Sequence, residues 1–327
     1  MQGMPEHGHM PVMMEEVLRF MELGKMKEPG VVMDCTIGRG GHAVKMAGEM
    51  ENAGGGTLIG LDVDPENLIF ARKRVEAEGF KRVELRTFHA NFGEVADVLA
   101  ELGMAGVDRL FADFGVSTNQ LLEKKHGLSF SADVALDMRL DPRIERNAAD
   151  LVAELDEKEL ARILQDYAQE RYAWRIARKI IQTRVDEPIL TTGQLARLVR
   201  SVVPGKWSQI DPATRTFQAL RMAVNSEIES IEGLLEAVPR MMKRNVPGRA
   251  VFLSFHSGED RLVKQAIRRW EDSGPSGAGA IAKSLTKKPL EPGENETHGN
   301  ARSRSAKLRA VEFFGRDRDG RDDVAAA

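Results

Sequence analysis

The sequence of 327 residues lacks most of the features that identify secreted, metal-bound or membrane proteins. Its single cysteine excludes an intramolecular disulfide framework and a zinc site built from several cysteines, and it is typical of a reducing compartment. No uncharged apolar run reaches about 18 residues, so we expect no segment that spans a membrane. The N-terminal stretch also lacks the charged and apolar regions of a secretory signal. These absences predict a soluble, cytoplasmic protein.

An excess of charge of either sign is missing as well. The 47 Lys and Arg residues oppose 50 Asp and Glu residues, and the net charge of −3 argues against a uniformly basic coat for nucleic acid. A local basic face is still compatible with this sum, because binding depends on where the charge lies. The hydrophobic content of 42% and the charged content of 30% are ordinary for a globular protein. At about 100–200 residues per domain, the length predicts two domains, or one large domain that carries an insertion.

Short β-branched runs alternate with helical stretches over residues 31–115. This alternation predicts βαβ units and a parallel sheet with right-handed crossovers. The expected strands lie within residues 31–38, 57–64, 83–90 and 107–115, and the expected helices within 42–50, 65–79 and 92–103.

Beyond residue 115 the pattern becomes helical. Helical periods recur in residues 148–168, 170–184 and 191–203, a long helix is expected over 212–243, and further strands within 249–257 and 306–314. Residues 271–300 are rich in Gly, Ser, Pro and Lys and are expected to form a mobile loop. We therefore predict a sheet domain from residues 1–115 and 212–327, with an all-helical substrate-recognition domain, residues 116–211, inserted into it.

The strongest local signal is an acid at the end of each of the first two strands, with a glycine-rich turn between them. Asp34 ends the first strand, Gly38, Gly40 and Gly41 follow, and Asp62 ends the second strand. Glycines allow close approach of the backbone to a ligand, and an acid about 20 residues further on is placed to bind ribose hydroxyls. The same glycines could merely close a tight turn.

The spacing favours a methyl donor over a dinucleotide. It reads D-x-x-x-G-x-G-G and not the G-x-G-x-x-G that binds a pyrophosphate. Asp34 would repel a diphosphate but suits the sulfonium and amino groups of S-adenosylmethionine. After the fourth strand, Asp113, Gly115 and the polar run 117–120 lie where ligands bind in open α/β sheets, although a solvated turn uses the same residue types.

Several ordered blocks resemble the ribosomal RNA small subunit methyltransferase H family, which methylates cytosine N4 in 16S rRNA. The blocks are HMPVMMEEVL, DCTIGRGGHA, LDVDP, DFGVSTNQL, GLSF, ALDMRLD, DPATRTFQALRMAVNSEIE, FLSFHSGEDR, LTKKPL and RSRSAKLRAVE. The resemblance implies a class I S-adenosylmethionine-dependent methyltransferase sheet, which is Rossmann-like, with the helical insertion described above.

The resemblance also implies the residues of the cofactor site. They are Gly40, Gly41 and His42 for the methionine end, Asp62 for the ribose, Phe92 for the adenine, and Asp113 and Gln120 to complete the pocket. On the residues alone, Phe92 is as well explained as a core aromatic and His42 as a residue at a helix N-terminus.

The implied substrate is one cytidine in the decoding region of 16S rRNA, within the small ribosomal subunit. Its N4 amine is a poor nucleophile because its lone pair is delocalised, so catalysis requires orientation and a proton acceptor. Asp113 is the candidate catalytic residue, although a nearby backbone carbonyl could orient N4–H instead. The target base must also leave its stack.

Two acid-poor stretches could contact RNA. In the first, Arg171, Arg175 and Arg178 share one helical face, and Trp174, Ala177 and Ile181 line another; a solvated helix surface is the simpler interpretation of this stripe. The second stretch contains Arg302, Arg304, Lys307 and Arg309.

Four further residues lie in the family-like blocks and are candidates for substrate binding: Arg139, Arg215, Asn225 and His256. Helix capping and interface hydrogen bonds explain Arg215 and Asn225 equally well, and a lone histidine such as His256 is often a satisfied loop residue.

Other functions have weaker support. His7 and His9 have no acid cluster beside them, so we expect no metal, and the HSGED segment lacks the G-x-S-x-G elbow of a serine hydrolase. An NAD-dependent oxidoreductase on a similar sheet and a non-catalytic ribosome-assembly factor stay open as alternatives. A homodimer is also compatible with the sequence.

Overall fold

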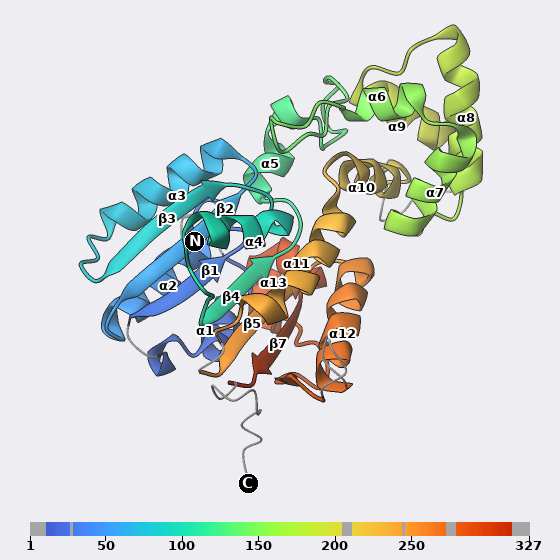
Figure 1. The fold of residues 1–327 in the computed structure, drawn as a ribbon. Coiled ribbons are helices and arrows are strands. Elements are labelled where there is room, and N and C mark those ends of the chain that lie inside the picture. The colour runs from blue at the N-terminus through green and yellow to red at the C-terminus, as the bar shows by residue number, and fades with distance from the viewer. Residues whose placement is uncertain (1–10, 27–28, 205–210, 244–245, 273–278, 316–327) are drawn as a thin grey trace. The chain divides into compact units, whose positions relative to one another are not determined.

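The computed structural model describes residues 11–26, 29–204, 211–243, 246–272 and 279–315. Contacts within the chain define two compact units (Figure 1). The first unit comprises Met1–Gly115 and Glu229–Ala327, and the second comprises Val116–Ile228.

The first unit contains a seven-stranded sheet with the order β3-β2-β1-β4-β5-β7-β6. Its strands are β1 (Gly30–Asp34), β2 (Gly56–Asp62), β3 (Val83–His89), β4 (Arg109–Asp113), β5 (Gly248–Ser254), β6 (Ala282–Ser284) and β7 (Lys307–Phe313). Strands β1 to β5 pair in parallel, and β7 is antiparallel to both β5 and β6. The α/β class and the parallel sheet expected from the alternating pattern are confirmed.

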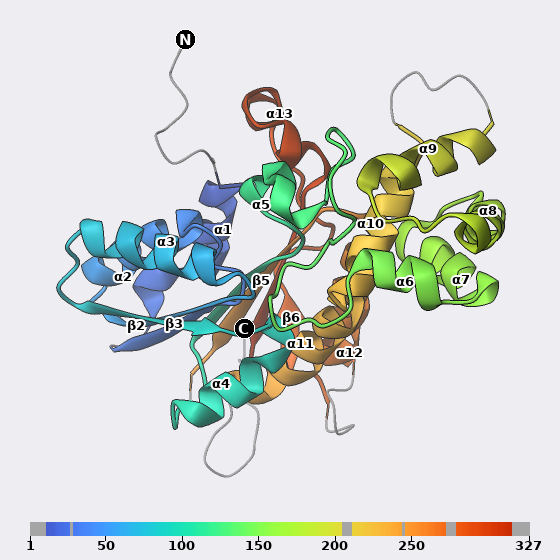
Figure 2. The same cartoon turned by 90° about the horizontal axis from the view of Figure 1, so that it is seen from above.

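Helices cover both faces of this sheet (Figure 2). They are α1 (Met14–Met21), α2 (Gly41–Asn52), α3 (Pro65–Ala77), α4 (Val95–Glu101), α11 (Glu227–Met241), α12 (Ser257–Asp272) and the short α13 (Glu294–Gly299). One apolar cluster joins the sheet to α4, α11 and α12, and the other joins it to α1, α2 and α3.

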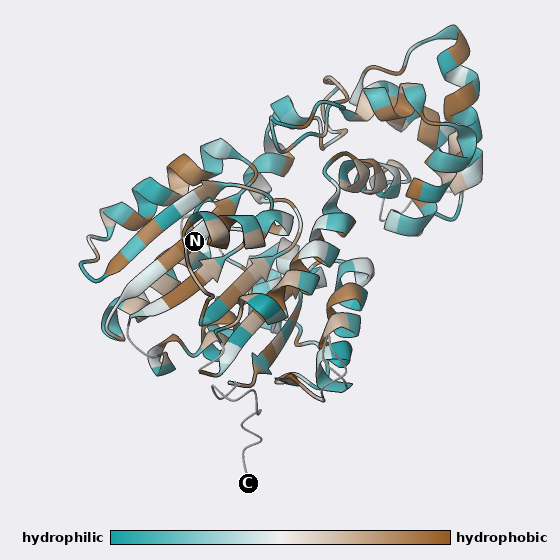
Figure 3. Cartoon of the chain, in the orientation of Figure 1, coloured by the Kyte–Doolittle hydropathy of each residue, from teal (hydrophilic) through white to brown (hydrophobic). Residues whose placement is uncertain are grey.

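Alternate residues of each strand enter opposite clusters. In β4, Leu110 and Ala112 belong to the first cluster and Phe111 to the second. Burial on both faces explains why these strands read as continuous apolar runs, which Figure 3 shows as brown bands in the central strands.

The second unit is helical. Its helices are α5 (Thr118–Leu122), α6 (Ala148–Glu154), α7 (Glu157–Ala168), α8 (Ala173–Asp186), α9 (Thr192–Val202) and α10 (Ala213–Val224). Within the described residues of this unit, the only β pairing is an isolated bridge between Ala135 and Thr191.

The second unit ends later in the chain than the expected boundary between residues 211 and 212. Helix α10 packs against α6, α7 and α9, and its Phe217 and Leu220 are buried. An amphipathic helix belongs to the core that buries its apolar side. Contacts therefore assign α10 to the helical unit and place the boundary after Ile228.

Two of the expected long helices are interrupted. Residues 148–168 form α6 and α7, because the side chain of Asp156 accepts the backbone N–H of Glu159 at 2.8 Å and caps a new helix. Residues 212–243 form α10 and α11, which are separated at Ser226, where φ is +48°. A left-handed residue cannot continue a right-handed helix.

The expectation of a mobile loop over residues 271–300 is wrong for its described part. Residues 282–284 form β6, which pairs with β7, and residues 294–299 form α13. Ile281 and Ala282 are buried in the sheet core. Because most of the segment is polar, its composition does not indicate that these two residues are buried.

Arg309 does not have the exposed position expected of a phosphate contact. It lies in β7, is only 7% exposed, and donates from Nε and Nη2 to the two carboxylate oxygens of Asp260 at 2.7 and 3.1 Å. Arg304 is exposed, whereas the side chain of Arg302 lies outside the described part. The second basic stretch therefore contains an arginine that is part of the core.

Replacing Arg309 tests this assignment. In Arg309→Met the carboxylate of Asp260 stays buried without its cation, which costs about 3–5 kcal/mol of unfolding free energy. Urea denaturation measures the loss. Arg304→Met is the control and should change stability by less than about 0.5 kcal/mol. Equal stability of the two variants would contradict a structural role for Arg309.

Candidate active site

Three aspartates end neighbouring strands at one edge of the sheet. Asp34 ends β1, Asp62 ends β2 and Asp113 ends β4. These strands are parallel, so their carboxyl ends meet at the same edge. The strand order reverses beside β1, since β2 and β3 lie on one side of it and β4 and β5 on the other. Open α/β sheets bind ligands at such a switch point.

Asp34 is a buried acid with an unused acceptor. It is 0% exposed, and its Oδ1 accepts the backbone N–H of Thr36 at 3.1 Å. Its Oδ2 has no hydrogen-bond partner among the residues that the structure describes. Burial raises the pKa of Asp34 to about 8, opposed by the Thr36 hydrogen bond and assisted by the charges of Asp113 and Asp62. At neutral pH the carboxyl group is therefore largely protonated.

Asp62 holds the glycine turn in place. Its Oδ2 accepts the N–H of Gly38 at 2.9 Å, and its Oδ1 accepts the N–H of Asp64 at 2.8 Å and the Nδ2–H of Asn67 at 3.3 Å. Burial raises the pKa of Asp62 to about 6, and these hydrogen bonds limit the rise. The acid predicted to bind ribose thus also connects the two loops that follow β1 and β2.

Thr36 links the ends of β1 and β4. Its hydroxyl oxygen accepts the backbone N–H of Asp113 at 2.7 Å. The sequence marks this residue only by a hydroxyl side chain two positions after Asp34, which is too common a feature to predict the contact. The contact fixes the backbone of the candidate catalytic residue.

The glycine turn has a structural reason for its composition. Gly38 and Gly40 have φ values of +51° and +77°, which favour glycine. A Cβ atom on Gly40 would lie 3.1 Å from the Cα of Ala71, and one on Gly41 would lie 2.7 Å from the Cγ of Pro11. Turn closure and close packing therefore explain these glycines, and their cofactor contacts stay a prediction.

His42 and Phe92 both pack against aromatic side chains. The Nε2 of His42 lies 3.0 Å from the carbonyl oxygen of Val12, and its ring centroid lies 4.7 Å from that of Phe111. Phe92 is half-buried, with its ring centroid 5.6 Å from that of Phe114. The aromatic packing that the sequence allowed for Phe92 and the position at a helix N-terminus that it allowed for His42 are both present, and their roles in the cofactor site are untested.

His256 caps a helix. It follows β5, and its Nδ1 accepts the backbone N–H of Gly258 at 3.2 Å at the start of α12. Its Nε2 lies 2.9 Å from Oε1 of the buried Glu259, whose Oε2 accepts the N–H of Phe255 at 2.7 Å. The Nε2 atom is nevertheless buried without a hydrogen-bond partner among the described residues, despite its ion-pair distance to Glu259. His256 is therefore a capping residue, but not the fully satisfied loop histidine that the sequence allowed.

In the second unit, Gln120 and Ser117 form a capping box at the start of α5. Gln120 is buried, and its Oε1 accepts the backbone N–H of Ser117 at 3.0 Å. The predicted cofactor contact of Gln120 is therefore a role in addition to capping.

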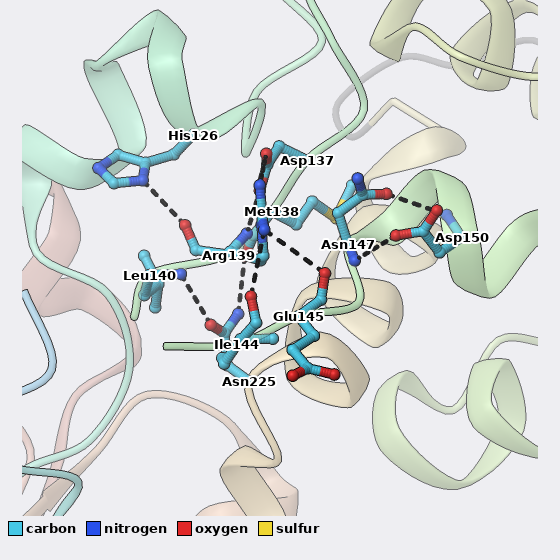
Figure 4. A network of polar contacts seen from close by, with 10 residues as sticks. All are labelled: His126, Asp137, Met138, Arg139, Leu140, Ile144, Glu145, Asn147, Asp150 and Asn225. Atoms are coloured by element: carbon cyan, nitrogen blue, oxygen red, sulfur yellow. Dashed lines mark hydrogen bonds and ion pairs between the residues drawn. The ribbon is translucent and has the colours of Figure 1, made fainter. Parts of the chain in front are cut away.

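Arg139 and Asn225 organise one loop of the second unit (Figure 4). Arg139 donates from Nε and Nη2 to the two carboxylate oxygens of Asp137, at 2.8 Å each, and from Nη1 to the carbonyl of Ile144 at 3.1 Å. The amide of Asn225 donates to the carbonyl of Met138 at 2.8 Å and accepts the N–H of Leu140 at 2.9 Å. Met138, which directly precedes Arg139 in this loop, has a φ of +66°. These contacts hold a strained loop, and substrate binding by either residue is untested.

The remaining candidates lie on exposed helix surfaces. Arg215 donates to the carbonyl of Gln169 at 3.2 Å, and Arg178 donates to Glu157 at 3.1 Å. The Cζ of Arg175 lies 5.7 Å from the ring centroid of Tyr172. Exposure keeps all three arginines accessible to a partner.

The described part of the chain contains neither a candidate metal cluster nor a candidate membrane-spanning helix. Within residues 11–315, apart from the four undescribed gaps, no group of three or more His, Cys, Asp or Glu residues could hold a metal ion. His7 and His9 lie outside the described residues. No helix in the described part of the chain is long and apolar enough to cross a membrane.

Comparison with known proteins identifies the family. The model of the MraW methylase family matches residues 6–314. The chain belongs to this family.

Two similar relatives cover nearly the full length. A protein named "Ribosomal RNA small subunit methyltransferase H" from Acidobacterium capsulatum is 41% identical over 94% of this chain and 99% of its own. A protein of the same name from Syntrophotalea carbinolica is 44% identical over 93% of this chain and 97% of its own. The structure of an rRNA methylase from Streptococcus thermophilus is more distant, with 8% identity and a TM-score of 0.40 over 89% of this chain and 91% of that one.

Membership of the MraW methylase family confirms three predictions: the class I methyltransferase fold, the methyltransferase activity and S-adenosylmethionine as cofactor. The carboxyl edge fits this cofactor. S-adenosylmethionine carries a sulfonium and an ammonium group, and the edge offers three carboxyl groups, one with a buried, unused acceptor oxygen. Membership of a methylase family also shows that the expected alternative of an NAD-dependent oxidoreductase is wrong.

Removing the carboxylate of Asp62 should weaken cofactor binding. Asp62→Ala loses a charge-assisted hydrogen bond of roughly 1.5–3 kcal/mol, so the dissociation constant of S-adenosylmethionine should rise at least about tenfold in calorimetry. Asp62→Asn keeps one acceptor oxygen and should have an intermediate effect. An unchanged constant in Asp62→Ala would contradict the ribose assignment.

Asp34 should make the stability of the cofactor-free protein depend on pH. Because its folded pKa of about 8 exceeds the ordinary value of 3.8, the stability that it contributes is complete below pH 3.8 and is lost as the pH rises through 8. The side chain introduced in Asp34→Asn cannot ionise. Between pH 6 and pH 9 the unfolding free energy of this variant should therefore fall by about 1–3 kcal/mol less than that of the unaltered protein.

Urea denaturation at both pH values measures this difference. Asp97→Asn is the matched control, because Asp97 is exposed on α4 and should leave the profile unchanged. Parallel profiles for the unaltered protein and Asp34→Asn would show that Asp34 is ionised throughout.

Proposed function

We propose that this protein transfers a methyl group from S-adenosylmethionine to the exocyclic N4 of one cytidine in the decoding region of 16S rRNA. The observation that carries the proposal is the edge where Asp34, Asp62 and Asp113 meet in a chain of the MraW methylase family. The name shared by the curated relatives supports small-subunit rRNA as the substrate.

The chemistry needs orientation more than a new nucleophile. Bound S-adenosylmethionine supplies a methyl group that its sulfonium makes electrophilic. The amine N4 must point its weakly available lone pair at that carbon and must lose a proton. Asp113, whose backbone is fixed by Thr36, is the proposed residue that accepts a hydrogen bond from N4–H and orients the amine.

Cys35 takes no part in this route. It is 1% exposed, and burial together with the charge of Asp34 raises the pKa of its thiol. The thiolate is the nucleophilic form of cysteine, so a buried thiol with a raised pKa is inert. This agrees with direct transfer to an amine.

The proposed roles of the other candidates follow their positions. The cofactor would be held by Gly40, Gly41, His42, Asp62, Phe92, Asp113 and Gln120. The RNA would be bound by Arg139, Arg175, Arg178, Arg215, Asn225 and His256. Of the latter, Arg175, Arg178 and Arg215 present exposed guanidinium groups, whereas Arg139, Asn225 and His256 would act from positions that their internal contacts hold fixed.

The proposed partner is the small ribosomal subunit, and the proposed place of action is the cytoplasm. A homodimer is part of this proposal, and sedimentation of the purified protein tests it. The expected alternative of a non-catalytic assembly factor disagrees with the methylase family to which the chain belongs.

Methyl transfer to isolated particles tests the function. Small subunits from a strain that lacks the enzyme are incubated with the purified protein and tritiated S-adenosylmethionine, and nucleosides are then mapped by mass spectrometry. We expect N4-methylcytidine at one decoding-region position, and no further incorporation into subunits from the parent strain. Incorporation at another nucleotide, or no incorporation into small subunits, would contradict the proposed substrate.

A further inference from the structure

The outer surface of α8 differs from that of an ordinary solvated helix. Its buried side consists of Ala173, Ile176, Ala177 and Ile180. The opposite side, together with the turn before the helix, presents the exposed residues Arg171, Trp174, Arg175 and Arg178, which we call the α8 outer face.

Trp174 occupies an unexpected position on this face. Helical periodicity predicts that it shares one side of the helix with Ala177 and Ile181, but its side chain is 51% exposed while Ala177 is buried. The other exposed large apolar residues in the described ranges are Ile69, Leu121, Val185 and Leu190, so Trp174 is the one aromatic among them. Packing within this unit does not account for a half-exposed tryptophan.

The charges around Trp174 are mostly positive. Arg175 stands over the ring of Tyr172, and Arg215 from α10 donates to the carbonyl of Gln169, close in sequence to Arg171. The neighbouring acid, Glu170, is buried at 7% exposure and accepts the backbone N–H of Tyr172 at 2.9 Å. Glu157 is the acid that reaches the face, and it pairs with Arg178.

We propose that Trp174 is a stacking position for an unpaired base of the acceptor RNA, with Arg171 and Arg175 binding the phosphates on either side. Every base has a π-face, and aromatic residues flanked by cations are the usual means of binding single-stranded nucleic acid. Trp and Arg are both common in protein interfaces, but the core of such an interface is apolar, whereas Trp174 is the single large apolar residue among the three arginines of the α8 outer face. One ring among cations matches a polyanion with stacking bases better. This inference rests on the proposed function, because it deepens the choice of RNA as substrate.

Binding to two related RNAs separates stacking from charge. The probes are a single-stranded 12-nucleotide RNA and the same backbone in which abasic sites replace the central bases. Trp174→Ala should weaken binding of the first RNA by between about fivefold and a hundredfold and leave the second unchanged. Trp174→Phe keeps a ring and should retain affinity within about threefold. Arg175→Ala should weaken both RNAs and reduce the salt dependence by about one phosphate contact.

Val185→Ala is the matched control, because Val185 is also exposed on α8 but lies eleven residues beyond Trp174, about three turns further along the helix. It should bind both RNAs like the unaltered protein. Thermal unfolding and the cofactor dissociation constant should be unchanged in all variants, and the Phe variant keeps the test valid if the Ala variant unfolds.

Three results would overturn the inference. Trp174→Ala could bind the base-bearing RNA normally, or it could lose affinity equally for both RNAs. It could also bind RNA normally yet methylate small subunits poorly, which would assign the face to a protein partner. Failure of the proposed function is distinguishable, since it would abolish methyl transfer by the unaltered protein whatever the result at Trp174.

Discussion

The electrostatics of one sheet edge dominate this molecule. Parallel pairing of β1, β2 and β4 brings the carboxyl groups of Asp34, Asp62 and Asp113 to the same edge, where burial and the charges of Asp113 and Asp62 disfavour the ionisation of Asp34. Burial raises the pKa of Asp34, so this carboxyl group binds a proton readily. Asp62 accepts hydrogen bonds from the backbone N–H groups of Gly38 and Asp64. At the proposed site, a cationic cofactor would relieve the same repulsion, so an arrangement that costs stability in the free protein would favour binding.

Polar residues that serve the fold surround this edge. Thr36 joins the ends of β1 and β4, Arg309 neutralises a buried acid of α12, and His256 caps that helix. Each belongs to a residue type that also binds substrates. Burial and hydrogen-bond partners, more than residue type, decide which role the structure supports.

In the helical unit, some polar side chains are used by the fold and others stay exposed. Its loop around Met138 is held by Arg139 and Asn225, which consume donors that a substrate could otherwise use. On α8 the arginines stay exposed beside a half-exposed Trp174. The accessible binding chemistry of this unit is therefore concentrated on one helix surface.

The sequence by itself determined the alternation of strands and helices, the acids at the ends of β1, β2 and β4, and the methyl-donor chemistry, because local periodicity and residue spacing carry that information. It could not determine the helix breaks at Asp156 and Ser226, the extent of the helical unit or the order of β6 and β7, since these depend on which surfaces find partners. Only the tertiary structure decided that Arg309 is buried against Asp260 and that Trp174 faces outward. The environment of a side chain is made by residues far away in the chain, and a one-dimensional pattern does not contain it.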